Sequence, residues 1–122
     1  MSYVYTIDSA KRVVSVHFEK TLNRQTIEAY AADLRSHPHF HPDFSEIVDL
    51  SRVEELELDA KQAVNLADNV DPFSLNSRRA FVAQTSTQTN AARMHHILRG
   101  GEENIRIFPT MREAKCWIEM GD

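Results

Sequence analysis

The chain has 122 residues, of which 42% are hydrophobic and 26% are charged, a length and composition typical of one globular domain. Its formal net charge of -4 weighs against non-specific binding of nucleic acid, which needs clustered Lys and Arg. A single cysteine excludes an intramolecular disulfide, and no apolar run approaches the ~20 residues that span a bilayer. Because the N-terminus also lacks the features of a signal peptide, we expect one cytoplasmic domain over residues 1–122.

The beginning of the chain predicts two strands and a helix. Residues 3–7 and 12–18 alternate in polarity and are rich in aromatic and β-branched side chains, and the short polar segment between them fits an antiparallel hairpin. The apolar positions over 27–34 then follow helical spacing, with Thr21 or Asn23 as the cap. A hairpin followed by an amphipathic helix is therefore expected.

The rest of the chain alternates strands with helices. Asp59 with Gln62 and Thr110 with Glu113 have the spacing of a capping box. Because such alternation forces crossovers, the sequence predicts an α/β fold, a single mixed, mostly parallel sheet of four to five strands with an N-terminal antiparallel hairpin and about four helices. We expect strands over 47–50, 80–83 and 104–108, and helices that begin near Asp59, Ala91 and Thr110, the second of them following a polar turn over 85–90 and ending at Gly100–Gly101.

Three histidines stand two residues apart, at His37, His39 and His41. This spacing can present ligands to a metal ion when the segment is an extended strand, because alternate side chains then share a face. Pro38 and Pro42 prevent regular strand pairing here, so we interpret the segment as a loop and expect no metal site.

The common catalytic motifs are absent from the sequence, including G-x-S-x-G, glycine-rich phosphate loops and H-E-x-x-H. Cys116 has no neighbouring histidine or cationic cluster in sequence that would activate its thiol. One alternative stays open, a general acid–base pair of Asp49 with a histidine that the fold brings close. We expect no enzyme and no cofactor.

Two polar segments are candidates for binding. Asp49 and Ser51 lie at the end of the predicted strand over 47–50, and open α/β sheets bind ligands beyond the carboxyl ends of their strands. Alternatively, Asp49 only holds the following loop by accepting the Ser51 N–H. The second segment is the polar turn over residues 85–90, which precedes a predicted helix. It either binds an anion at free backbone N–H groups or only caps that helix. Its candidate residues are Thr87, Thr89, Asn90 and Arg93.

The acidic residues are concentrated in one part of the chain. Between residues 43 and 59, the only basic residue is Arg52, and the acidic residues are Asp43, Glu46, Asp49, Glu54, Glu55, Glu57 and Asp59. Such an acidic run is normally a solvated face, and the alternative is a binding patch for a basic partner.

The whole chain resembles the SpoIIAA-like branch of the STAS superfamily. The similarity rests on "DLSRV" after a strand, then "RRAFVAQ", then "IRIFPTMREAKCWI", which contains Phe108, Glu113, Ala114 and Trp117 at positions typical of bacterial members. The resemblance implies a four- or five-stranded mixed sheet covered by helices, and a non-enzymatic interaction module.

The resemblance also bears on phosphorylation. Anti-sigma-factor antagonists of this superfamily carry a phosphorylatable serine at the start of the helix that follows the "D-L-S-x-V" strand end. This chain matches the strand end from Asp49 to Val53, but its helix starts with Asp59, Ala60 and Lys61. A phosphoserine switch is therefore expected to be absent.

We accordingly expect a regulatory module that binds another protein or a second copy of itself, as a homodimer, through the region of Asp49, Ser51, Asp59 and the acidic run. The alternative is a carrier or sensor of a small amphiphile, lipid or anion, because the branch also looks like the lipid-binding CRAL-TRIO fold. Its cleft would lie at the carboxyl ends of the strands, between helices. Tyr30, Leu66, Phe73 and Met94 would line that cleft.

Overall fold

One mixed sheet organises the computed structural model, which describes residues 3–99 and 104–120, and of residues 95–99 the backbone alone. Within these residues five strands lie in the sheet in the order β1-β2-β3-β4-β5. β1 is antiparallel to β2, and every other neighbouring pair is parallel, as the sequence predicts. The strands are β1 (Tyr3–Asp8), β2 (Val13–Asn23), β3 (Ser45–Glu57), β4 (Arg79–Val82) and β5 (Ile105–Phe108).

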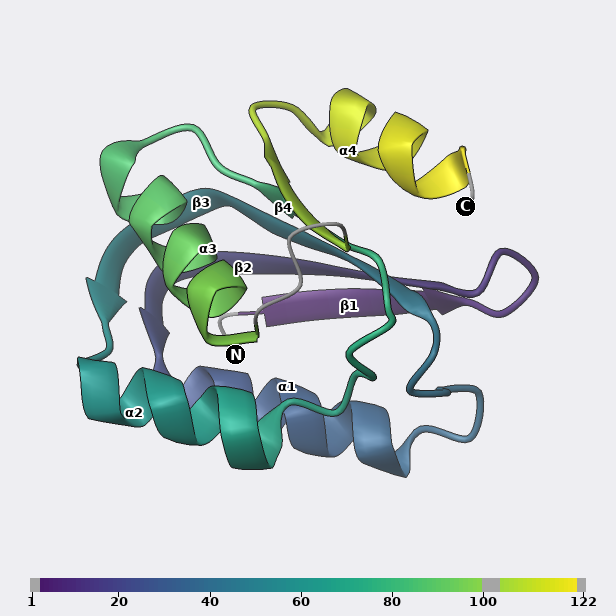
Figure 1. Ribbon diagram of the computed structural model, residues 1–122, viewed down its shortest axis with the longest axis horizontal. Helices are drawn as coiled ribbons and strands as arrows, with labels where there is room; N and C mark the ends of the chain where they lie inside the picture. The colour runs from purple at the N-terminus through teal and green to yellow at the C-terminus, as the bar shows by residue number, and fades with distance from the viewer. Residues whose placement is uncertain (1–2, 100–103, 121–122) are drawn as a thin grey trace.

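Helices cover both faces of the sheet (Figure 1). The first three helices and a π-helical segment, η1, pack on one face, where they enclose the larger core. On the other face α4 packs its Trp117 and Ile118 against Ile47 and Val82. The bounds are α1 (Arg24–Ser36), α2 (Ala60–Asn65), η1 (Leu66–Val70), α3 (Ser86–Arg99) and α4 (Met111–Glu119).

Local capping fixes where the helices start, and three caps fall where the sequence places them. Asn23 accepts a hydrogen bond from the Thr26 N–H at 2.9 Å and caps α1. Asp59 forms the complete capping box with Gln62 at the start of α2. Thr110 accepts the N–H three residues on and caps α4. Each cap satisfies a backbone donor that the helix itself leaves free.

The structure corrects the predicted extent of β3. The strand does not end at Leu50 but continues to Glu57, although beyond Asp49 it pairs with β2 alone. Two register shifts each insert one extra residue into β3, so the period-two alternation is broken after Leu50. Val53 is nevertheless 2% exposed and belongs to the larger core, which keeps the strand in place.

The prediction of a polar turn over 85–90 is also wrong for most of its length. α3 begins at Ser86 rather than near Ala91. The hydroxyl of Thr85 accepts the Gln88 N–H at 3.2 Å, so the first turn is a capped helix despite its polar composition. The predicted end of this helix at Gly100–Gly101 lies outside the described residues.

Candidate functional site

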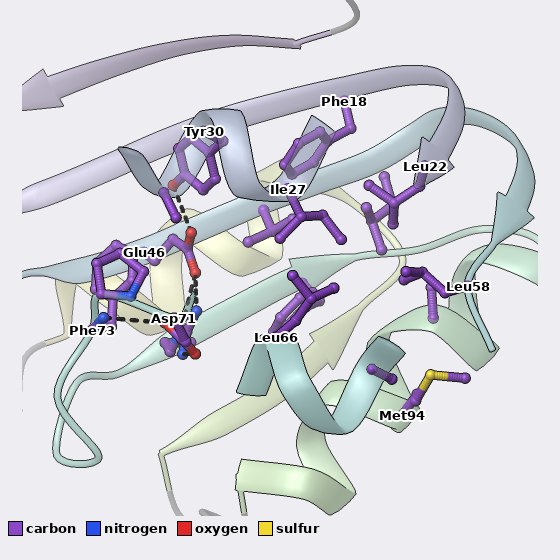
Figure 2. Close-up of a pocket in the computed structure, with 18 residues that line it drawn as sticks. Phe18, Leu22, Ile27, Tyr30, Glu46, Leu58, Leu66, Asp71, Phe73 and Met94 are labelled. Atoms are coloured by element: carbon purple, nitrogen blue, oxygen red, sulfur yellow. Dashed lines mark hydrogen bonds and ion pairs between the residues drawn. The ribbon is translucent and has the colours of Figure 1, made fainter. Parts of the chain in front are cut away.

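A cavity of about 100 Å³ lies between the sheet and the helices that cover its larger core (Figure 2). α1, the α2–η1 segment and α3 form its outer wall, and β2, β3 and β4 form its floor. The alternating side chains of the strands create this floor, because most of those pointing to this face are apolar. The apolar residues that line the cavity include Phe18, Leu22, Ile27, Val48, Leu66 and Phe81.

One end of the cavity is polar and charged, and four side chains form it (Figure 2). Glu46 and Arg79 are paired neighbours on β3 and β4, so the register sets them side by side on the cavity face. Arg79 Nε and Nη2 each lie 2.9 Å from Glu46 Oε1, and Nη1 lies 2.6 Å from Asp71 Oδ2. The hydroxyl of Tyr30 donates to Glu46 Oε2 at 2.6 Å. We call these four residues the charged cluster.

Burial makes the charged cluster electrostatically unusual. Glu46 is 1% and Arg79 is 5% exposed, and the Asp71 side chain is 4% exposed. Burial by itself lowers the pKa of Arg79, but the carboxylates of Glu46 and Asp71 raise this pKa by a larger amount. The net shift is upward, so the guanidinium stays charged. Burial, followed by the Glu46 carboxylate, raises the pKa of Tyr30 well above its ordinary value, so its hydroxyl remains a donor.

Sequence reasoning found the apolar part of this site and missed its charged part. Tyr30, Leu66, Phe73 and Met94, the residues expected around an interhelical cleft, all line the cavity. The charged end, however, lies at the amino ends of β3 and β4, not beyond their carboxyl ends.

The sequence places Glu46 in an acidic run that is expected to be a solvated face, which is wrong for this residue because it is 1% exposed. The signal that could have found it is a pair of opposite charges at the starts of two predicted neighbouring strands. Glu46 is two residues from Val48, and Arg79 is two residues from Phe81, so both charges share a face with buried apolar side chains.

Asp49 belongs to a different part of the molecule. Its Oδ1 accepts the Ser51 N–H at 2.9 Å, which is the local role that the sequence offers as an alternative, and its Oδ2 lies 2.8 Å from His17 Nδ1. Burial raises the pKa of Asp49, but hydrogen bonds from Ser51 and then the contact with His17 lower it more, so the net shift is downward. Because its neighbours Val48 and Leu50 line the cavity, Asp49 points to the opposite face.

The two predicted binding segments are only partly brought together. Thr87 and Asn90 line an open surface hollow of about 430 Å³ with Glu54, Glu55 and Leu56 of β3. The second segment therefore meets the acidic run. The remaining candidates lie elsewhere. Asp59 caps α2, Thr89 donates its N–H to the Thr85 carbonyl, and Arg93 is exposed. Neither Asp49 nor Ser51 lines the cavity.

Gln88 is a residue that sequence reasoning missed. It is 2% exposed and lies where β4 has ended and β3 continues. Its Nε2 donates to the carbonyls of Ser51 at 3.2 Å and Val53 at 2.8 Å, while its Oε1 accepts the Gln84 N–H at 2.7 Å. The Gln88 amide therefore donates to β3 carbonyls that lie beyond the end of the pairing with β4, and this contact holds α3 beside the extension of β3.

The three spaced histidines form a loop that is held by its own hydrogen bonds. His37 Nδ1 accepts the N–H of His39 and His41 Nδ1 accepts the N–H of Asp43, both at 3.1 Å. Among the described residues, no group of three or more His, Cys, Asp or Glu is placed to hold a metal ion. Nor is any helix in the described ranges both long and apolar enough to cross a membrane.

Two solved structures resemble this chain over nearly its whole length, whereas no family model and no curated protein sequence matches it. An uncharacterized protein of the DUF3478 family from Shewanella loihica, described as having a SpoIIAA-like fold, superposes with a TM-score of 0.65 at 19% identity, covering 96% of this chain and 94% of that chain. The chain has a SpoIIAA-like fold. A second match, an anti-sigma factor antagonist from Mycobacterium paratuberculosis, has a TM-score of 0.56 at 18% identity, with the same coverage.

The start of α2 is the position at which the sequence predicts no phosphorylatable serine. In this chain the first residues of that helix are Ala60 and Lys61, and the cap is the carboxylate of Asp59. Asp59 therefore already satisfies the free N–H of Gln62 with a negative charge.

Proposed function

We propose that this chain is a non-enzymatic regulatory module that takes a small, largely apolar molecule into the cavity between its helices and its sheet. The observation that carries the proposal is an apolar cavity of about 100 Å³ that ends on the charged cluster. Apolar walls with a few convergent polar groups are the usual composition of a ligand site. The fold that the chain shares with an anti-sigma factor antagonist supports a regulatory rather than a catalytic role.

The volume of the cavity sets the size of the ligand. Protein interiors are close-packed, and a void of about 100 Å³ costs a fold about 2 kcal/mol of stability. An engineered cavity of about 150 Å³ takes up benzene, so this one suits a molecule of roughly four to five non-hydrogen atoms.

A titration with 1-butanol followed by amide NMR tests this proposal. We expect saturable shifts at residues that line the cavity, such as Val48 and Leu66, with a Kd near 1 mM, or about −4 kcal/mol. Ala91→Leu extends a side chain into the cavity and should abolish these shifts. Ala32→Leu makes the same change on an exposed position of α1 and should preserve them. Shifts that survive Ala91→Leu unchanged, or that never saturate in the parent protein, would overturn the proposal.

A protein partner is the second candidate function, and the surface hollow beside α3 favours it. The hollow places the exposed carboxylates of Glu54 and Glu55 next to Thr87 and Asn90, which gives an acidic recess for a basic segment. Glu55→Lys should weaken capture of such a partner, whereas Asp43→Lys, an equal charge change at another exposed position, should not. Equal capture by both variants would remove the hollow as the docking surface.

A further inference from the structure

Two arginine side chains lie against the single tryptophan of the chain, on the face of the sheet opposite the cavity. The guanidinium carbon of Arg78 lies 4.2 Å from the centre of the Trp117 ring, and that of Arg106 lies 5.5 Å from it. Both distances are within the limit of about 6 Å for a cation–π contact. Trp117 is 8% exposed and packs in the core that α4 covers, so its ring is a fixed support for both cations.

The sheet brings these two cations to the same face. Arg78 continues the line of β4, because its carbonyl accepts the N–H of Glu46 on β3 at 2.9 Å. Arg106 of β5 pairs with Ala80 of β4, two residues after Arg78. Residues two apart in an extended segment share a face, so Arg78 and Arg106 lie on the same face of neighbouring segments. β5 is the last strand in the order of the sheet and Arg106 is exposed, so solvent reaches the pair from this edge.

The charges of these two arginines are not balanced by any side chain that the structure describes. Within residues 3–99 and 104–120, neither guanidinium forms an ion pair or a hydrogen bond, and Nη1 of Arg78 is buried without an acceptor. A buried donor in this position has given up its hydrogen bonds to water without a replacement. The carboxylate of Glu119, two residues after Trp117, contacts Lys11 instead, at 3.5 Å.

We propose that Arg78 and Arg106 form a binding site for a phosphate group, carried by the free ion or by a small phosphate monoester. This site lies on the other face of the sheet from the cavity and does not depend on the proposed function. Guanidinium groups bind phosphate oxygens through paired, charge-assisted hydrogen bonds. A phosphate monoester carries a charge of about −1.5 to −2 at pH 7, which matches two guanidinium groups, whereas a carboxylate balances only one of them.

The contacts with the ring prepare the site for an anion. Because Trp117 supports both guanidinium groups, little side-chain freedom is lost when a ligand binds. Arg78 is half-buried, so an anion beside it interacts more strongly than with a fully solvated arginine. The phosphate oxygens approach from the exposed side of Arg106.

A titration of the intact protein with inorganic phosphate tests this inference, with the indole N–H resonance of Trp117 as the reporter. Sodium chloride and acetate at the same ionic strength and pH 7 are the reference titrations. We expect a saturable shift with phosphate and a half-saturation concentration at least about tenfold higher with acetate. A resonance that moves no more with phosphate than with chloride would overturn the site. Equal affinities for acetate and phosphate would overturn the assignment to phosphate.

Glycerol phosphate, titrated in the same way, separates the two sources of the phosphate group. Binding at least as tight as that of inorganic phosphate supports a monoester as the ligand, and weaker binding supports the free ion.

A pair of variants shows whether the arginines themselves hold the phosphate. Arg106→Gln removes the exposed cation and should weaken phosphate binding at least about tenfold. Arg52→Gln makes the same charge change at an exposed position in the extension of β3 and should change the affinity by less than about twofold. The ³¹P line width of phosphate is measured in parallel, because Arg106→Gln also alters the surroundings of the reporter ring. Equal weakening by the two variants would overturn the site in favour of a general effect of net charge.

Discussion

Replacing Arg79 with methionine should destabilise the protein strongly. The side chain keeps much of its apolar volume in this substitution, but the guanidinium that contacts two buried carboxylates is lost. Its nitrogens lie 2.9 Å from Glu46 Oε1 and 2.6 Å from Asp71 Oδ2 in the parent protein. Glu46 then loses its ion pair in a low-dielectric environment.

The size of the effect follows from burial. Removing one partner of a buried charge pair typically costs about 3–5 kcal/mol, and the 1% and 5% exposures of Glu46 and Arg79 place this pair in that class. A domain of this size has a total stability of roughly 6–18 kcal/mol, so the variant loses a large share of it. The corresponding fall in Tm is roughly 10–25 °C.

Urea unfolding followed by circular dichroism at pH 7 measures this loss. Arg78→Met is the matched control, because Arg78 lies on the other face, 4.2 Å from the centre of the Trp117 ring, and its loss should cost about 1 kcal/mol. Equal losses for the two variants would refute the electrostatic reasoning.

Three smaller effects follow from other contacts. Asp49→Asn should lower stability by about 1–2 kcal/mol at pH 7. The folded-state pKa of Asp49 lies below its unfolded value, so this difference should vanish as the pH falls through that folded pKa in acid unfolding titrations; a pH-independent difference would argue against it. Asp59→Ala should cost about 1 kcal/mol in urea unfolding by removing the cap of α2, and no loss would contradict the capping role. Tyr30→Phe should cost about 1–3 kcal/mol by leaving Glu46 Oε2 short of a donor, whereas an unchanged urea midpoint would show that the bond is dispensable.

The features that could be predicted from the sequence are those that depend on neighbouring residues. The hairpin, the cap at Asn23 and the capping box at Asp59 are encoded within a few positions of each other, so periodicity and spacing reveal them. The mostly parallel direction of the strands is also predictable, because the alternation of strands and helices requires crossovers.

The features that escaped prediction depend on contacts between distant segments. β3 continues past Leu50 because β2 supports it through two register shifts, which disturb the alternation on which sequence reading relies. Glu46 and Arg79 are charged residues whose burial is costly, and their pairing with each other, with Asp71 and with Tyr30 makes it tolerable. Gln88 takes its role from the place where β4 ends, which the sequence does not mark.

The central claim is that the cavity between the helices and the sheet binds a small apolar molecule, and xenon binding tests this claim most directly. Xenon enters apolar cavities without needing a polar partner. A crystal of the protein pressurised with xenon should show a single strong site among Val48, Leu66 and Phe81, and a crystal of Ala91→Leu should lack it. Density for xenon elsewhere on the protein but none between these three side chains would contradict the account.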